Sequence, residues 1–352
     1  MKSIKILDTT LRDGSYTTNF SFSTNDTSTI CNELQKAGIE FIEIGHGVGF
    51  RGSEKGFGKA TQTDEEYLKA AKSVLKKSKV GMFCIPGIAK LEDIDMAGRH
   101  EMDFIRIGTD VTKIHESKKF IEKAKDYGMY VAANYMKSYA LSPEKFSEKV
   151  LLSEQYGADV IYVVDSAGGM FGDELEKYYE EIRKISQISL GFHGHDNLGM
   201  AVSNSLLAAE LGFDIIDSSL QGLGRSSGNA STEILVAALT KRGFTTNINF
   251  RKILEVGINK IQSKTNKGKM PLDIVAGFTD FHSSYMPHIE KFSREYKVDP
   301  ISLMIEITKI DKVNLDLIIL ENIAKKLPTV NIFDDEKFNF NSYIGKEQDE
   351  FS

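Results

Sequence analysis

Two histidines separated by a single glycine carry the strongest chemical signal in this sequence. His193 and His195 lie in the segment GFHGHDN, at the end of a short apolar run. In an extended segment, side chains at positions i and i+2 point to the same side, so both imidazoles can reach one metal ion. A pair of core histidines that only bridge hydrogen bonds is the alternative. The spacing favours a metal site with two nitrogen ligands.

A third ligand is available just after the first apolar run. Arg12 and Asp13 stand there side by side, and their alternative role is a salt bridge on the rim of the fold. In a closed barrel of eight strands, only the eighth strand would separate Asp13 from the two histidines of the seventh. Two imidazole nitrogens and one carboxylate suit Mn²⁺ or Mg²⁺, and they are also compatible with Zn²⁺ or Co²⁺. We therefore expect a divalent-metal site at Asp13, His193 and His195.

Two segments of small residues follow later apolar runs and are candidate ligand-binding loops. The segment 222–229, GLGRSSGN, could approach a ligand closely through its backbone. The segment 165–169, DSAGG, offers backbone amides and the Ser166 hydroxyl, which could hold a carboxylate or a phosphate. A simple tight turn is the alternative for this second loop.

These residues need a fold that brings the ends of several strands together. Short apolar runs rich in β-branched residues alternate with stretches of helical spacing, which is typical of a parallel sheet. No G-x-G-x-x-G follows the first run, and this favours an α/β fold of the closed (β/α)8 TIM barrel type over an open, doubly wound sheet. The eight runs are Ile4–Thr9, Phe41–Gly45, Val80–Ile85, Phe104–Gly108, Tyr130–Asn134, Val160–Asp165, Ser189–His193 and Ile215–Leu220.

The strand pattern stops after the eighth run, and helical spacing continues to about residue 327. We expect a TIM-barrel catalytic domain over residues 1–240 and a helical C-terminal domain over residues 241–330. A tail without clear periodicity, rich in Asp, Glu, Asn and Phe, would cover residues 331–352. In a TIM barrel the active site lies at the C-terminal ends of the strands, which is where the candidate residues fall.

Composition limits the classes of partner. The net charge of −6 argues against a nucleic-acid or anionic-membrane surface, because either would require clustered Lys and Arg. The two cysteines, Cys31 and Cys84, lack the spacing of a zinc site or a disulfide framework and indicate buried thiols. No long apolar run suggests a signal peptide or a membrane span, so we expect a cytoplasmic protein with a small-molecule substrate.

Five motifs together resemble one enzyme family. They are LDTTLRDG at the start, GHGVGFRGS after the second run, VDSAGG after the sixth, GFHGHDNLGMAVSNS at the seventh, and GLGRSSGNASTE after the eighth. This set resembles the metal-dependent 4-hydroxy-2-oxovalerate aldolases, members of the metallolyase superfamily that includes HMG-CoA lyase and isopropylmalate synthase. The resemblance covers nearly the whole chain, because the segment 270–299 looks like the aldolases' C-terminal domain.

The resemblance implies a role for each matching residue. Asp13, His193 and His195 would be the metal ligands, and Arg12 would be the cation that stabilises the pyruvate enolate. The hydroxyl of Ser166 would hold the pyruvate carboxylate. An asparagine that reaches the metal in the HMG-CoA lyase branch matches Asn229, which would be either a fourth ligand or a residue that contacts the ligands.

Two positions depart from the family pattern. The aldolases carry a catalytic histidine three residues after the metal aspartate and a tyrosine in the C-terminal domain, whereas this chain has Tyr16 and His282 there. One hypothesis is that the two side chains have exchanged places, so that the imidazole reaches the site from the opposite side and the phenol holds the substrate hydroxyl. The alternative is a divergent aldehyde pocket, with a metal-bound water as the base.

The resemblance implies a class II aldolase, a carbon–carbon lyase that cleaves or forms a 4-hydroxy-2-oxo acid from pyruvate and an aldehyde through a metal-stabilised enolate. The alternatives are a Claisen-type acyltransferase that condenses a 2-oxo acid with an acyl-CoA, and a non-catalytic barrel. Because aldolases of this family often pair with an aldehyde dehydrogenase, such a partner is also implied. We expect a homo-oligomer, with a dimer as the default. The sequence does not identify the aldehyde, the metal or the direction of the reaction.

Overall fold

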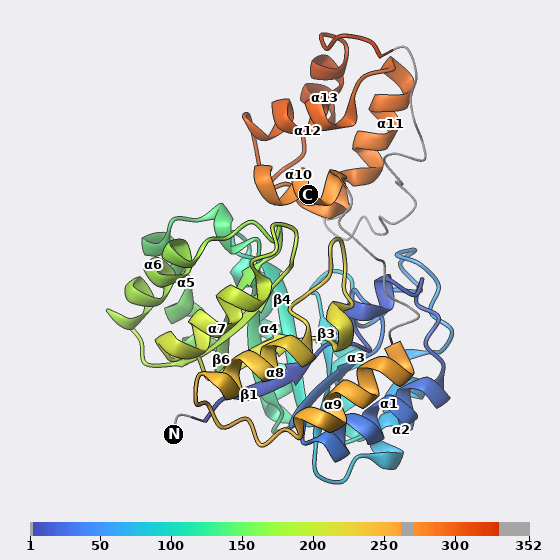
Figure 1. Cartoon of the computed structure of the whole chain (residues 1–352), viewed down its shortest axis with the longest axis vertical. Helices are drawn as coiled ribbons and strands as arrows, with labels where there is room; N and C mark the ends of the chain where they lie inside the picture. Colours follow the sequence, from blue (N-terminus) through green and yellow to red (C-terminus); the bar gives the residue numbers. More distant parts are fainter. Residues whose placement is uncertain (1–2, 262–270, 331–352) are drawn as a thin grey trace.

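The computed structural model describes residues 3–261 and 271–330 of the chain. Within these residues, eight parallel strands pair in sequence order, and β8 pairs with β1 to close the barrel (Figure 1). The predicted TIM barrel is therefore confirmed. The strands are β1 (Lys5–Asp8), β2 (Phe41–Ile44), β3 (Lys79–Cys84), β4 (Phe104–Asp110), β5 (Tyr130–Met136), β6 (Val160–Asp165), β7 (Ser189–Gly194) and β8 (Ile215–Ser218).

Strands of this barrel are buried on both faces. Side chains such as Leu7, Phe41 and Phe104 fill the inside, while helices cover the outside. Every residue of β6 is buried, and β4 is buried up to its last residue. Burial on both faces explains why the strands appear in the sequence as continuous apolar runs rather than as an alternation of apolar and polar residues.

The helices that connect the strands begin and end at local sequence signals. The Ser23 hydroxyl accepts a hydrogen bond from the Asp26 amide, and the Asp26 carboxylate accepts one from the Ser23 amide, which starts the first helix. Gly38 and Gly157 end two helices with φ of 98° and 100°, in the left-handed region that favours glycine. The helices of the barrel are α1 (Thr24–Ala37), α2 (Asp64–Val74), α3 (Leu91–Arg99), α4 (Lys118–Asp126), α5 (Pro143–Tyr156), α6 (Gly172–Arg183), α7 (Ala201–Leu211) and α8 (Thr232–Lys241).

One further helix packs on the barrel beyond residue 240. Helix α9 (Phe250–Val256) and the π-helical turn Gly257–Ile261 follow α8, and α9 lies against α1 and α8. Ile253, Val256 and Ile261 are fully or almost fully buried in the barrel core. The predicted boundary at residue 240 stays a prediction, and this packing favours a division after residue 261.

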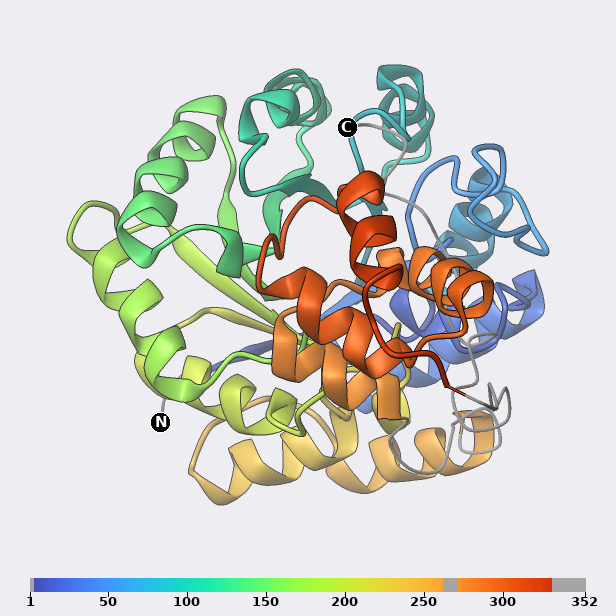
Figure 2. The ribbon, with the colours of Figure 1, turned by 90° about the horizontal axis from the view of Figure 1, so that it is seen from above.

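A unit of helices with its own core lies over one end of the barrel (Figures 1 and 2). It contains α10 (Pro271–Thr279), α11 (Met286–Tyr296), α12 (Pro300–Thr308) and α13 (Leu317–Ala324). The end it covers carries the C-terminal ends of the strands, because Lys137, which follows β5, donates a 2.8 Å hydrogen bond to the Tyr285 hydroxyl. The predicted helical region is therefore present, and it sits above the expected active site.

Two predictions concern other parts of the chain. The tail predicted over residues 331–352 lies outside the described residues. Among the residues that the structure describes, no helix is both long and apolar enough to cross a membrane.

Candidate active site and metal centre

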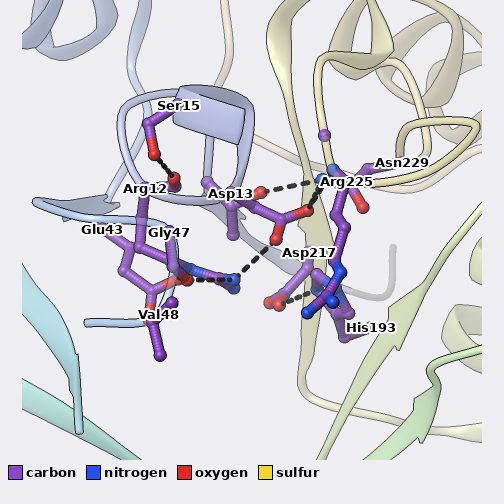
Figure 3. Close-up of polar contacts among 12 residues, drawn as sticks. Arg12, Asp13, Ser15, Glu43, Gly47, Val48, His193, Asp217, Arg225 and Asn229 are labelled. Atoms are coloured by element: carbon purple, nitrogen blue, oxygen red, sulfur yellow. Dashed lines mark hydrogen bonds and ion pairs between the residues drawn. The ribbon is translucent and has the colours of Figure 1, made fainter. Parts of the chain in front are cut away.

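Three side chains from two parts of the barrel converge on one point. Asp13 begins the short 3₁₀ helix η1 (Asp13–Tyr16) just after β1, His193 lies in β7, and His195 directly follows it. One potential ligand atom from each of the three lies within 4.8 Å of the other two, and all three residues are buried. Figure 3 shows Asp13 and His193 turned toward the same space. The three residues predicted as ligands are thus brought together.

One ring nitrogen of each histidine forms a hydrogen bond, and this orients the other ring nitrogen toward the site. His193 Nδ1 lies 2.8 Å from Asp217 Oδ2, and His195 Nδ1 lies 3.3 Å from the Gly228 carbonyl oxygen. Each imidazole therefore donates through Nδ1 and keeps Nε2 as the ligand nitrogen. A carboxylate or carbonyl behind a histidine is the usual support of a metal-binding imidazole. The donor set fits a divalent metal ion.

The electrostatic surroundings keep Asp13 and His195 in the forms that bind metal. Burial alone would raise the pKa of Asp13, but the Arg12 guanidinium and the two histidines hold that pKa below its usual range. Burial lowers the pKa of His195 to about 4, against the opposing effect of Asp13. Asp13 is therefore ionised and His195 neutral near pH 7.

The Asn229 amide supports Asp13 from the loop after β8. Its Nδ2 donates to Asp13 Oδ2 at 2.7 Å and to the Leu223 carbonyl oxygen at 3.1 Å. Its Oδ1 is buried and has no hydrogen-bond partner among the described residues. The two bonds from Nδ2 suit a residue that supports Asp13, and the unpartnered Oδ1 suits a fourth ligand, so either role stays a prediction.

Arg12 is held beside Asp13 by fixed partners. Its Nε donates to Glu43 at 2.7 Å, and its Nη1 donates to Asp13 Oδ1 at 2.7 Å (Figure 3). Its guanidinium carbon lies 4.7 Å from the centre of the Phe83 ring. Burial would lower the pKa of Arg12, but Glu43 and Asp13 raise it above its ordinary value. A permanent positive charge therefore lines the pocket next to the ligands.

A chain of buried charges, not predicted from the sequence, links Arg12 to His193. Glu43 Oε2 accepts from Arg12 and, at 3.0 Å, from Arg106. Arg106 Nη2 also contacts Asp217 Oδ2 at 2.6 Å, and Asp217 accepts from His193. Arg106 and Glu43 are fully buried. The sequence signal for these three residues is one charged residue inside an otherwise apolar strand. It is Glu43 in FIEI, Arg106 in FIRIG and Asp217 in IIDS.

Ser166 follows β6 and lines the same pocket as Arg12 and the ligands. Its Oγ accepts a 2.9 Å hydrogen bond from the Lys137 amide, which follows β5. Because that bond uses a lone pair, the hydroxyl hydrogen can still point to a ligand. Ser166 is therefore placed to donate a hydrogen bond to a bound oxygen.

The two residues that depart from the family pattern reach the pocket from different units. Tyr16 belongs to η1, and His282 comes from the helical unit directly before the 3₁₀ helix η7 (Ser283–Tyr285). His282 Nδ1 accepts a hydrogen bond from the Ser284 amide at 3.3 Å, so the neutral imidazole carries its hydrogen on Nε2. Burial and the nearby charge of Arg225 lower the pKa of His282 well below its usual value. His282 is thus a neutral hydrogen-bond donor.

The pocket is small, and both apolar side chains and charged or polar groups line it. Its empty volume is about 490 Å³, open solvent at its mouth included. Seven of the eight predicted site residues line it, and Asn229 contacts Asp13 behind them. The lining side chains are Arg12, Asp13, Tyr16, Val48, Phe83, Ile85, Asn134, Met136, Val164, Ser166, His193, His195, Arg225 and His282, together with Gly47. Such a pocket suits a small polar molecule.

Comparisons with known proteins agree with this geometry. The HMGL-like family model matches residues 3–258. The 4-hydroxy-2-oxovalerate aldolase of Carboxydothermus hydrogenoformans is 35% identical over 94% of this chain and 99% of its own length. The oxaloacetate decarboxylase of Mycobacterium tuberculosis is 36% identical over 82% of this chain and 86% of its own.

A solved structure shares the barrel. The crystal structure of the HMG-CoA lyase from Brucella melitensis superposes with a TM-score of 0.64, at 18% identity, over 75% of this chain and 99% of that one. At that identity the likeness concerns the fold alone. The family model, by contrast, covers most of the chain, and the relatives above match it along nearly their full lengths. The chain belongs to the HMGL-like family.

Proposed function

We propose that this protein is a divalent-metal-dependent pyruvate aldolase that cleaves or forms a 4-hydroxy-2-oxo acid. The observation that carries this proposal is the convergence of Arg12 with Asp13, His193 and His195 in one buried pocket. Full-length similarity to a 4-hydroxy-2-oxovalerate aldolase supports the reaction class. The substrates are accordingly small molecules, a 2-oxo acid and an aldehyde.

Asp13, His193 and His195 would hold the metal ion, for which Mn²⁺ or Mg²⁺ suits a ligand set of mixed nitrogen and oxygen atoms. When bound, such an ion supplies Lewis-acid stabilisation of negative charge on the 2-oxo group. Asn229 would keep Asp13 oriented through the hydrogen bond to Oδ2. Asp217 and the Gly228 carbonyl would do the same for the two imidazoles.

The chain's own residues would bind the pyruvate half and stabilise its enolate. The fixed charge of Arg12 stabilises the oxyanion that develops when the bond between C3 and C4 breaks. The hydroxyl of Ser166 donates to the pyruvate carboxylate. The helical unit lies over the barrel end (Figure 2), and less water around the substrate there would strengthen both interactions.

Tyr16 and His282 would form hydrogen bonds to the oxygen on C4. The Nε2 hydrogen of His282 can donate to that oxygen, which holds the aldehyde and stabilises the alkoxide formed from it in the condensation direction. In the cleavage direction a water molecule would act as the base that takes the 4-hydroxyl proton, and C3 of the enolate would gain a proton to give pyruvate. Tyr16 lines the pocket from the opposite unit and would hold the same hydroxyl. A His282→Ala variant that retains full turnover would contradict this assignment.

Oxaloacetate decarboxylation is a second candidate, supported by the similarity to the mycobacterial enzyme of that name. Loss of carbon dioxide from C4 leaves the same pyruvate enolate but removes no hydroxyl proton, so it needs no base. The Claisen-type alternative differs from both because it would release a free thiol from an acyl-CoA. The three reactions can therefore be separated by product.

The test is pyruvate release, coupled to lactate dehydrogenase, from metal-stripped protein with and without added Mn²⁺. The panel contains 4-hydroxy-2-oxo acids, oxaloacetate, and pyruvate with an acyl-CoA. We expect Mn²⁺-dependent pyruvate release from at least one 4-hydroxy-2-oxo acid, lost in His195→Gln and retained in His100→Gln, a partly exposed histidine paired with Glu65. Release from oxaloacetate alone would favour the decarboxylase, and thiol release would favour the acyltransferase.

We further propose that the protein forms a homo-oligomer and that an aldehyde dehydrogenase consumes its product. The reason for proposing the dehydrogenase is chemical, because cleavage releases a reactive aldehyde that such an enzyme would oxidise. Sedimentation and co-purification with such a dehydrogenase test the two proposals. The cytoplasmic location stays a prediction.

A further inference from the structure

We propose that Asn134 of β5 binds the carboxylate on the pyruvate half of the substrate through its side-chain Nδ2. This inference rests on the proposed aldolase function and adds a substrate-binding residue that the sequence motifs do not include. Asn134 lines the same pocket as Arg12 and Ser166, and it is buried, with only 3% of its surface exposed. A buried amide in that position needs a partner for each of its polar atoms.

The alternation of side chains along β5 points Asn134 into the barrel. Tyr130 and Ala132 pack inside the barrel, and residues two apart on a strand face the same side. Tyr135 lies on the other face, where its hydroxyl donates to Ser153 Oγ of α5 at 2.6 Å. Asn134 therefore extends the inner wall above Ala132 and forms part of the floor of the pocket.

Arg106 determines which atom of the Asn134 amide is left for a ligand. Arg106 Nη2 lies 2.7 Å from Asn134 Oδ1, and Glu43 and Asp217 hold Arg106 in place. Because a guanidinium can only donate, the atom that it meets must be the amide oxygen, and Nδ2 must point away from it. Within the part of the chain that the structure describes, Nδ2 donates no hydrogen bond. A donor so placed is best satisfied by an oxygen of the bound substrate.

The assignments around C2 decide which oxygen that is. The oxo oxygen, C3 and the carboxylate spread from C2 in one plane. Arg12 is assigned to the oxo oxygen, and C3 carries C4, whose oxygen is assigned to Tyr16 and His282. The carboxylate must therefore point to the remaining side, where β5 carries Asn134 and the adjacent strand β6 leads into Ser166. Two donors from neighbouring strands can hold the two oxygens of one carboxylate.

Pyruvate and pyruvamide test the proposal, because they have the same shape and only pyruvate has the carboxylate. Calorimetry measures the affinity of each for Mn²⁺-loaded protein. Asn134→Leu removes the donor without adding charge. Asn134→Asp keeps an oxygen for Arg106 and replaces the donor by an acceptor. Asn25→Asp, at an exposed position of α1, is the control for the added charge.

We expect the wild type to bind pyruvate more tightly than pyruvamide. Asn134→Leu should weaken pyruvate binding roughly 10- to 100-fold, because a hydrogen bond to a charged group is lost, and weaken pyruvamide binding less than about fivefold. Asn134→Asp should reverse the preference, since the amide of pyruvamide can donate to the carboxylate that this variant introduces, whereas pyruvate is repelled. Asn25→Asp should behave as the wild type.

Turnover gives a second measurement. Asn134→Leu should raise KM for the 4-hydroxy-2-oxo acid by about the factor seen for pyruvate and change kcat less than about threefold, because the carboxylate is bound alike before and during bond cleavage. Its Mn²⁺ affinity should stay within about threefold of the wild type, since Asp13, His193 and His195 are unchanged.

Equal weakening of pyruvate and pyruvamide in Asn134→Leu would overturn the proposal, because the donor would then not meet the carboxylate. A loss of Mn²⁺ affinity in that variant would overturn it as well and indicate that Asn134 only supports His193 through Arg106 and Asp217. Unchanged pyruvate binding in Asn134→Leu would exclude Asn134 from the pyruvate site and leave the aldolase function intact. Failure of the aldolase function would appear in the wild type itself, which would bind no pyruvate, and both proposals would then fall.

Discussion

Asp217 contacts both His193, a proposed metal ligand, and the buried Arg106 through one oxygen atom. Its Oδ2 accepts from His193 Nδ1 at 2.8 Å and contacts Arg106 Nη2 at 2.6 Å. In the same way, Glu43 accepts hydrogen bonds from both Arg12 and Arg106 through Oε2. The orientation of His193, a proposed metal ligand, and that of Arg12, the proposed enolate-stabilising cation, therefore depend on the same fully buried guanidinium.

We predict that Arg106→Met destabilises the protein by roughly 3–5 kcal/mol, because it leaves the Glu43 and Asp217 carboxylates buried without their shared cation. Burial would lower the pKa of Arg106, but Asp217 and Glu43 raise it above the ordinary value, so it stays charged in the wild type. Urea unfolding measures the loss. Arg242→Met, at an exposed position, should change stability by no more than about 0.5 kcal/mol. Equal stability of the two variants would contradict the argument.

Site residues that lie close together in the sequence could be predicted from the sequence alone. The spacing of His193 and His195 and the adjacency of Arg12 and Asp13 are visible without a fold. Arg106 could not be paired from sequence with Glu43 or Asp217, because the three come from β4, β2 and β8, and the pairing arises only when the barrel closes.

A buried acid, Asp8, connects β1 with α8. Asp8 is fully buried at the end of β1, where its Oδ1 accepts from the Thr10 amide at 3.0 Å. Its Oδ2 accepts from Thr232 Oγ1, the first residue of α8, at 3.3 Å. Burial raises the pKa of Asp8 to about 7, and the charge of Glu233 adds to the effect.

We predict that the contribution of Asp8 to the free energy of unfolding falls as the pH rises from about 4 to about 7. Over that range the folded protein keeps the proton that the unfolded chain releases, so deprotonation favours unfolding. Three pKa units correspond to at most about 4 kcal/mol. Asp8→Asn, which cannot ionise, should therefore gain stability relative to the wild type between pH 5 and pH 8 in urea titrations.

The control for this pH dependence is Asp173→Asn, on the exposed face of α6. The hydrogen bond and charge of Lys177 hold the pKa of Asp173 below its usual value, so it is ionised in both states above pH 5. Its variant should follow the wild type across the range. A pH-independent difference between Asp8→Asn and the wild type would show that Asp8 is not protonated in the folded protein.

The strands themselves were predictable to within a few residues, because burial on both faces produces apolar runs that the intervening helices separate. The end of the barrel was harder to predict. Helix α9 has the same apolar spacing as a helix of the C-terminal unit, and only its contacts with α1 and α8 show which core it joins. Helical periodicity identifies a buried face but not the surface against which that face packs.

The whole molecule combines two units into one site, and Lys137 is a main connection between them. Its side chain is almost completely buried, and its Nζ donates to the Tyr285 hydroxyl at 2.8 Å and to the Val313 carbonyl oxygen at 2.9 Å. Asp110 of the barrel lies 3.4 Å from the same nitrogen. The unit anchored in this way also carries His282 into the pocket, the placement that the family resemblance implied.

We predict that Lys137→Met lowers kcat roughly 10- to 100-fold, because small displacements of a group at the reacting centre are costly and His282 depends on this docking. The loss should approach that of His282→Ala, whereas Mn²⁺ affinity measured by calorimetry should stay within about threefold of the wild type, since Asp13, His193 and His195 all belong to the barrel. Hydrogen exchange in α10–α13 should accelerate. Lys177→Met, on the exposed face of α6, should change none of these quantities. A parallel loss of Mn²⁺ affinity in Lys137→Met would instead mean that the helical unit stabilises the metal site itself.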